Sequence, residues 1–183
     1  MTVMNNNSES APRKKPELLA PAGGWEQMEA AIRFGADAIY MGTDRFGMRQ
    51  RAENFTLENM PKAVEYAHER GVKVHVTLNT LMHEEDFDDL PRYVQSLDDA
   101  GVDVLIVSDM GAFSLVREIA PRIDLHVSTQ SSVSNTRAAL EWYRMGAKRI
   151  VLARELSLAA IADMRKKLPP DLELECFVHG SMC

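Results

Sequence analysis

The chain repeats one strand and helix pattern along most of its length. Short apolar runs alternate with longer segments in which apolar residues recur every three or four positions, and these patterns are typical of buried strands and amphipathic helices. The phrases "FGADAIY", "AGVDVLIV" and "MGAKRIVL" share one order, in which a helix ends, a glycine follows and a strand begins. Because each strand is followed by a crossover helix, the pattern predicts an α/β fold with a parallel sheet.

The pattern predicts seven strands and six helices. The strands are expected at Glu17–Ala20, Ala38–Met41, Val72–Leu78, Val104–Val107, Asp124–Val127, Arg149–Leu152 and Glu173–Val178. The helices are expected near Trp25–Phe34, Leu57–Arg70, Phe87–Ala100, Ala112–Ala120, Asn135–Met145 and Leu158–Leu168. The glycines between a helix and the next strand are Gly35, Gly71, Gly101 and Gly146. A left-handed helix cap suits glycine there, because glycine has no Cβ to clash.

Two architectures fit alternating strands and helices, a closed barrel and an open doubly wound sheet. The open sheet often carries a GxGxxG nucleotide loop after its first strand, and the sequence lacks that motif. We therefore expect a parallel (β/α) TIM-like barrel that is incomplete, since a full barrel takes about 250 residues. Residues 1–15 are expected to form a disordered tail. Residues 16–183 are expected to be the N-terminal portion of a barrel domain whose remainder, with any C-terminal region, is missing.

Net charge and the distribution of apolar residues indicate which partners and which compartment to expect. The formal net charge of −6 argues against a uniformly basic nucleic-acid surface but leaves room for a local basic patch. The first fifteen residues lack the apolar core of a signal peptide, and no later apolar run approaches the roughly 20 residues of a membrane helix. We therefore expect a cytoplasmic protein that does not use a membrane. In that reducing compartment, the two cysteines are expected to be core residues, metal ligands or catalytic groups rather than a disulfide.

Candidate functional residues follow the strands, because the carboxyl ends of parallel barrel strands and the loops after them line one shared mouth. The candidate substrate-binding residues at these positions are Arg49, Asn79, Asp109, Gln130, Arg154, Glu155 and His179. Together they predict a polar mouth of mixed charge.

Each arginine of the mouth could either bind a ligand or have a structural or surface role. Arg49 lies in a cluster with Arg45 and Arg51, and a guanidinium fork suits a carboxylate, a phosphate or an RNA backbone. The alternative is a solvated loop on a surface that needs positive charges somewhere. Arg154 and Glu155 are adjacent, and a structural ion pair that holds their loop is the alternative to a role in the site.

The C-terminal segment holds both thiols. Cys176 falls within the predicted last strand and is expected to be a buried structural residue, whereas Cys183 falls in the loop after it and is a candidate metal ligand. The histidines within strands, His75 and His126, are expected to be ordinary core or surface residues. The sequence has no HExxH helix, GxSxG elbow, P-loop or lysine at a strand's carboxyl end, so it does not define the catalytic residues.

Several segments, taken in order, resemble one known family. They are "ELLAPAGGWEQMEAAIRFGADAIYMG", "FGMRQRAENF", "GVKVHVTLNTL", "DVLIVSDMGAFSLVRE", "LHVSTQSSVSN", "KRIVLARELSL" and "ECFVHGSMC". They are similar to the N-terminal domain of peptidase family U32, the collagenase-like proteins, over nearly all of Pro16–Cys183. The resemblance implies a barrel-like N-terminal domain and a further C-terminal region. It also implies that Cys183 matches the first of four cysteines that hold a four-iron, four-sulfur cluster, whose other three ligands this sequence lacks.

The resemblance also implies a choice of activities. The tRNA branch of the family makes 5-hydroxyuridine with prephenate as a required metabolite, so the expected partners are tRNA and a small anionic metabolite. Sibling branches hydroxylate ribosomal RNA or act on a quinone precursor, and the family name records an older peptidase assignment, that of a hydrolase. The alternative outside the enzymes is a fragment that binds RNA without catalysis. We expect the tRNA hydroxylation enzyme, and the sequence leaves the oligomeric state open.

Overall fold

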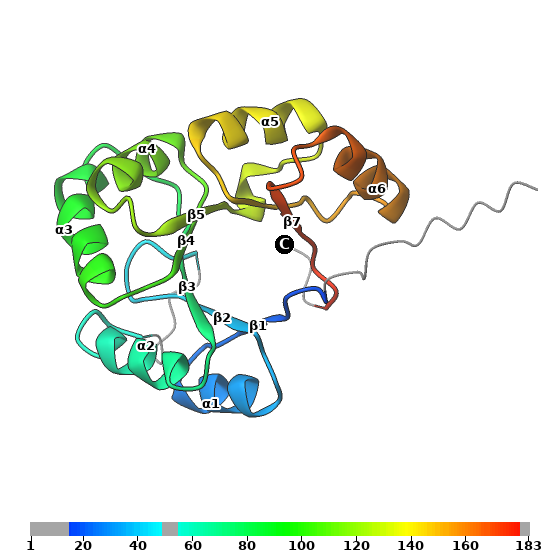
Figure 1. The fold of residues 1–183 in the computed structure, drawn as a ribbon. Helices are drawn as coiled ribbons and strands as arrows, with labels where there is room; N and C mark the ends of the chain where they lie inside the picture. The colour runs from blue at the N-terminus through cyan, green and yellow to red at the C-terminus, as the bar shows by residue number, and fades with distance from the viewer. Residues whose placement is uncertain (1–14, 49–54, 180–183) are drawn as a thin grey trace, which may run out of the picture.

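Seven parallel strands form one sheet that curls into an incomplete barrel, with helices on its outer face (Figure 1). The computed structural model describes residues 15–48 and 55–179. The strands stand in the sheet in chain order. They are β1 (Leu19–Pro21), β2 (Ala38–Met41), β3 (Lys73–Leu78), β4 (Val104–Val107), β5 (Asp124–Val127), β6 (Arg149–Val151) and β7 (Glu173–Glu175). The predicted parallel, incomplete TIM-like barrel is confirmed.

The helices also follow the prediction. They are α1 (Trp25–Arg33), α2 (Met60–His68), α3 (Asp86–Asp99), α4 (Met110–Ile119), α5 (Thr136–Met145) and α6 (Leu158–Lys167), with a short 3-10 helix η1 (Thr129–Ser131) after β5. Gly146 ends α5 with φ of 106°, so the expected left-handed cap is present. Two elements are shorter than predicted by three residues at one end: α2 begins at Met60 instead of Leu57, and β7 stops at Glu175 instead of Val178. No helix in the described ranges is long and apolar enough to cross a membrane.

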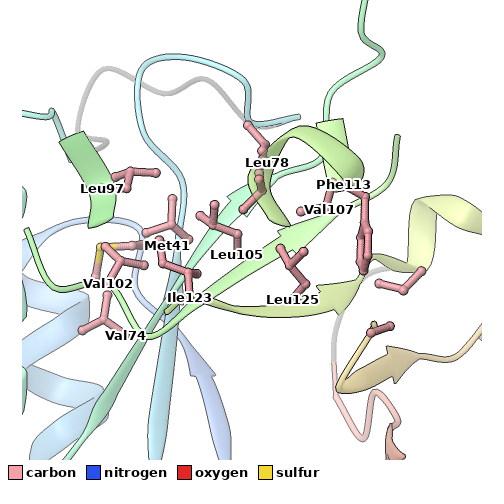
Figure 2. Close-up of a cluster of buried hydrophobic side chains, with 14 of the residues drawn as sticks. Met41, Val74, Leu78, Leu97, Val102, Leu105, Val107, Phe113, Ile123 and Leu125 are labelled. Carbon is pink, nitrogen blue, oxygen red and sulfur yellow. The ribbon is translucent and has the colours of Figure 1, made fainter. Parts of the chain in front are cut away.

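The outer face of the sheet packs against the helices and forms the main hydrophobic core (Figure 2). Val74, Leu105 and Leu125 come from neighbouring strands and are buried against helix residues such as Leu97 and Phe113. Burial of a side chain of this size contributes roughly 1.5–3 kcal/mol. Because strand side chains alternate between faces, this core also decides which residues point into the barrel.

The inner face is less apolar. It holds a small cluster made of Val104, Ile106 and Val151, packed against Tyr40. The buried polar residues on this face are His75 of β3, His126 of β5 and Arg149 of β6. The inside of the sheet is therefore a polar layer around a few aliphatic side chains.

Candidate functional site

Asn79 joins three segments at the mouth, the end of the barrel formed by the loops that follow the strands. Its Nδ2 donates to Oγ of Ser128 over 3.4 Å, which connects the end of β3 with the end of β5. Its Oδ1 accepts from the backbone N of Met48 over 3.3 Å, and its own backbone N donates to the carbonyl of Phe46 over 3.0 Å. Asn79 thus holds the loop after β2 against the strands that form the floor of the mouth.

The loop after β2 is fixed from its other side as well. The hydroxyls of Thr43 and Tyr93 lie 2.7 Å apart, and the ring of Phe46 packs on the ring of Tyr93 with centroids 4.9 Å apart. Phe46 has φ of 59°, a left-handed conformation that costs free energy and persists only where surrounding contacts fix it. The described part of this loop ends at Met48, so the predicted role of Arg49 falls outside the described residues and stays a prediction.

Two of the predicted mouth residues occupy different settings in the loops after β4 and β5. Asp109 is the N-cap of α4, and its Oδ1 accepts from the backbone N of Ala112 over 2.9 Å. One of its oxygens therefore stabilises a helix end. Gln130 lies in η1 with its side chain exposed, so it remains available to a ligand.

Arg154 does not form the alternative ion pair with Glu155. Its guanidinium carbon lies over the ring of Phe177, 4.0 Å from the centroid, while Glu155 is exposed and forms no ion pair with it. A guanidinium on an aromatic face gains electrostatic attraction and apolar contact at once. The loops after β6 and β7 are therefore joined through this stacked pair. His179, the last residue described, is exposed beyond it.

The expected burial of Cys176 is wrong. Its side chain is exposed, because β7 ends one residue earlier and Cys176 does not belong to the sheet. Partial cover and the neighbouring Glu175 carboxylate raise the pKa of the Cys176 thiol, which disfavours its thiolate. Cys183 lies outside the described residues.

Arg149 forms the centre of an ion-pair network inside the barrel that was not predicted from the sequence. Its Nε donates to Glu173 over 2.8 Å, and its Nη1 donates to Glu17 over 2.7 Å and to Glu175 over 3.2 Å. Because it begins β6, it lies toward the amino ends of the strands, opposite the mouth. The available signal was an arginine at the start of an apolar strand, followed by two glutamates on the next strand.

His75 and His126 form a pair of perpendicular rings within the same layer. Their centroids are 5.1 Å apart, and both side chains are almost fully buried. Burial, with the positive charge of Arg149 as a second cause, lowers the pKa of His75 to about 4 and that of His126 to about 2. Both imidazoles are therefore neutral at physiological pH. Both histidines are core residues, one of the two positions expected for them, and their contact depends on the curvature of the sheet.

The described residues do not supply a metal site. They include no group of three or more histidine, cysteine, aspartate or glutamate side chains placed to hold a metal ion. A four-iron, four-sulfur cluster usually takes four thiolates, and the described part of the chain contains a single cysteine, the exposed Cys176. The residues of the described mouth therefore do not fit such a cluster.

A family model described as peptidase family U32 matches residues 23–183. The chain belongs to peptidase family U32. The resemblance read from the sequence motifs is thus confirmed, and the match covers both the loop after β2 and the segment after β7.

Among U32 relatives, the chain is 42% identical over 189 residues to tRNA hydroxylation protein P1 of Bacillus subtilis, a match that covers 100% of this chain and 44% of the relative. It is 40% identical over 167 residues to a 23S rRNA 5-hydroxycytidine synthase of Escherichia coli, covering 91% of this chain and 25% of the relative. The chain therefore spans less than half the length of these relatives. A solved structure of a U32 peptidase aligns with a TM-score of 0.73 at 17% identity, covering 92% of this chain and 73% of that one. This structural likeness supports the fold.

Proposed function

We propose that the protein to which this chain belongs hydroxylates uridine in tRNA and forms 5-hydroxyuridine. The observation that carries the proposal is the 42% identity to tRNA hydroxylation protein P1, which extends over the whole of this chain. The mouth supports it, because Gln130 presents an exposed amide and Arg154 a guanidinium at the ends of two strands. Such groups suit the bases and phosphates of RNA.

The proposal includes a small metabolite and a cofactor, both implied by the sequence resemblance. Prephenate is the required small metabolite, and its carboxylates would suit the guanidinium of Arg154. A four-iron, four-sulfur cluster would use Cys183 together with thiolates that this sequence does not contain. We place tRNA modification in the cytoplasm and derive no chemical step from the cluster, since the described residues do not form its site.

Hydroxylation of ribosomal RNA is the second candidate. It is favoured by the 40% identity to the 23S rRNA 5-hydroxycytidine synthase. A peptidase is less well supported by the mouth. The described residues show no hydrogen bond from a serine, threonine or cysteine side chain to a histidine, and Ser128 instead contacts Asn79. Thr129 points its hydroxyl at the carbonyl of Leu152 over 3.4 Å, so neither hydroxyl has the base that a nucleophile needs.

The test is complementation with the complete gene. An Escherichia coli strain without its own tRNA hydroxylation protein P and without its 23S rRNA 5-hydroxycytidine synthase receives the gene or an empty vector. Nucleosides of tRNA and of ribosomal RNA are then quantified separately by mass spectrometry. We expect 5-hydroxyuridine to return in tRNA. Return of 5-hydroxycytidine in ribosomal RNA alone supports the second candidate, and the absence of both from cells that produce the protein contradicts RNA hydroxylation.

A further inference from the structure

Arg154 is an arginine of the mouth whose guanidinium has a fixed position. Its guanidinium carbon lies 4.0 Å from the centroid of the Phe177 ring. The residues just before it are held too, because the backbone N of Ala153 donates to the carbonyl of Val133 over 3.1 Å. The carbonyl of Leu152 accepts from Thr129 Oγ1 over 3.4 Å. The position of the charged group is therefore set by contacts with the loops after both β5 and β7.

The same guanidinium has no acidic partner in the part of the chain that the structure describes. Its side chain forms no hydrogen bond or ion pair there, and its Nε is buried without a hydrogen-bond partner. The other arginine described in the mouth loops, Arg45, differs, because it pairs with Asp89 over 3.0 Å. A guanidinium carries five donors, and a buried donor without a partner costs free energy. Arg154 therefore retains the hydrogen-bonding capacity that an anionic ligand would use.

The surroundings allow an anion to approach. Gln130, on the loop that contacts the segment before Arg154, is exposed and has no side-chain hydrogen bond among the described residues. Glu155 is also exposed, so solvent screens its charge, whereas Arg154 is half-buried. Because Nε of Arg154 is buried, its two Nη groups are the donors that a phosphate or carboxylate would use.

We propose that Arg154, clamped on Phe177, is the anion-binding group at the β6 and β7 side of the mouth. Its ligand is an oxyanion, either a phosphate of the RNA or a carboxylate of the small metabolite. This inference rests on the proposed function for the choice of ligands. The opposing interpretation is that the stack only fastens the segment after β7 to the loop after β6. Both interpretations predict that the stack orders the segment, but only the first predicts a direct loss of anion affinity.

The experiment measures binding by the complete protein and needs no catalysis. The variants are Arg154→Gln, which removes the charge, and Arg154→Lys, which keeps the charge but loses the planar fork. Phe177→Leu keeps an apolar side chain but removes the aromatic face. The matched control is Arg144→Gln, because Arg144 is exposed near the end of α5, at the opposite end of the barrel, and pairs only with Glu141. Circular dichroism and thermal melts establish that each variant is folded.

Unmodified tRNA is titrated over a series of salt concentrations, and prephenate is titrated separately by calorimetry. If Arg154 holds an RNA phosphate, Arg154→Gln should weaken tRNA binding about tenfold. It should also reduce the slope of log affinity against log salt by about one. If it holds the metabolite, prephenate affinity should fall by a similar factor while the tRNA salt slope stays unchanged. Arg154→Lys should retain an intermediate affinity and Arg144→Gln the wild-type value.

The proposal is overturned if folded Arg154→Gln binds both tRNA and prephenate as the control does. It is also overturned if Phe177→Leu causes the full loss of tRNA or prephenate affinity while Arg154→Gln does not. The stack would then only hold the segment after β7 against the loop after β6. Failure of the proposed function is a separate result, since it is read from modified nucleosides in cells, whereas these affinities are measured without turnover.

Discussion

Arg149 and Glu17 lie 132 residues apart in the sequence, yet Nη1 of the arginine donates to Oε1 of the glutamate over 2.7 Å. Glu17 precedes β1, and Arg149 begins β6 beside β7. The bond therefore crosses the inside of the curled sheet and links segments near its two ends. Since Glu173 and Glu175 accept from the same guanidinium, one buried arginine binds three carboxylates.

Removal of this arginine should destabilise the fold strongly. Arg149→Met would leave three carboxylates close together without their cation. Loss of one partner from a buried ion pair costs roughly 3–5 kcal/mol, and we expect the lower end of this range because the Glu173 side chain is half exposed and its charge is screened by solvent. Urea unfolding at neutral pH would measure the free energy of unfolding. Arg144→Met is the control, because its pair with Glu141 is exposed on both sides and such pairs contribute about 0–1 kcal/mol. Equal losses in the two variants would contradict a special role for the internal network.

The buried histidine pair should make stability fall as the solution becomes acidic. The folded state holds the pKa of His75 at about 4 and that of His126 at about 2, below the unfolded value of about 6.5. The unfolded chain therefore binds more protons below pH 6.5, so stability rises with pH across this window. Between pH 7 and pH 5, each histidine should account for about 2 kcal/mol of lost stability.

The variant that tests this is His126→Phe, which keeps an aromatic ring but cannot take up a proton. Urea unfolding at pH 5, 6 and 7 should give a shallower pH dependence than in the wild type. His83→Gln serves as the control, because His83 is exposed in the loop after β3. An unchanged slope in His126→Phe would mean that the histidine is hydrated in the folded protein.

Asn79 should control the order of the loop after β2. Asn79→Ala removes the acceptor for Met48 and the donor for Ser128, and each lost hydrogen bond of this kind costs about 1 kcal/mol. Hydrogen exchange followed by mass spectrometry should show faster exchange in residues 43–48. Gln95→Ala, which removes only an exposed bond to Asp99 within α3, should leave that peptide unchanged. Wild-type exchange in the Asn79→Ala loop would contradict the assigned contact.

Replacement of Cys183 should remove cluster and activity in the complete protein, whereas replacement of Cys176 should not. Cys183→Ser is expected to abolish the iron-sulfur absorption of anaerobically purified protein and the formation of 5-hydroxyuridine, because loss of one thiolate weakens a four-cysteine site. Cys176→Ser should retain both and change stability by no more than about 0.5 kcal/mol, since Cys176 is exposed and lies outside the sheet. A wild type without iron, or a Cys183→Ser protein that keeps cluster and activity, contradicts the cluster proposal.

The candidate site was predictable in position but only partly in detail. The rule that barrel loops follow the carboxyl ends of strands located Asn79, Gln130 and Arg154 at one mouth. It did not reveal that Asn79 ties the loop after β2 to Ser128. It also left open whether Arg154 pairs with its neighbour Glu155 or serves the site, and it did not predict the stack on Phe177. The side chains of adjacent residues such as Arg154 and Glu155 can point in different directions, and only the structure shows which contacts each one makes.

The sequence alone determined the seven strands, the six helices and their parallel order, because local periodicity and glycine caps report on backbone conformation near each residue. Only the tertiary structure decided which inward residues meet, as in the contacts of Arg149 with Glu17 and of His75 with His126. Those contacts depend on how far the sheet curls and on the register between strands, which are set by packing among segments far apart in the chain.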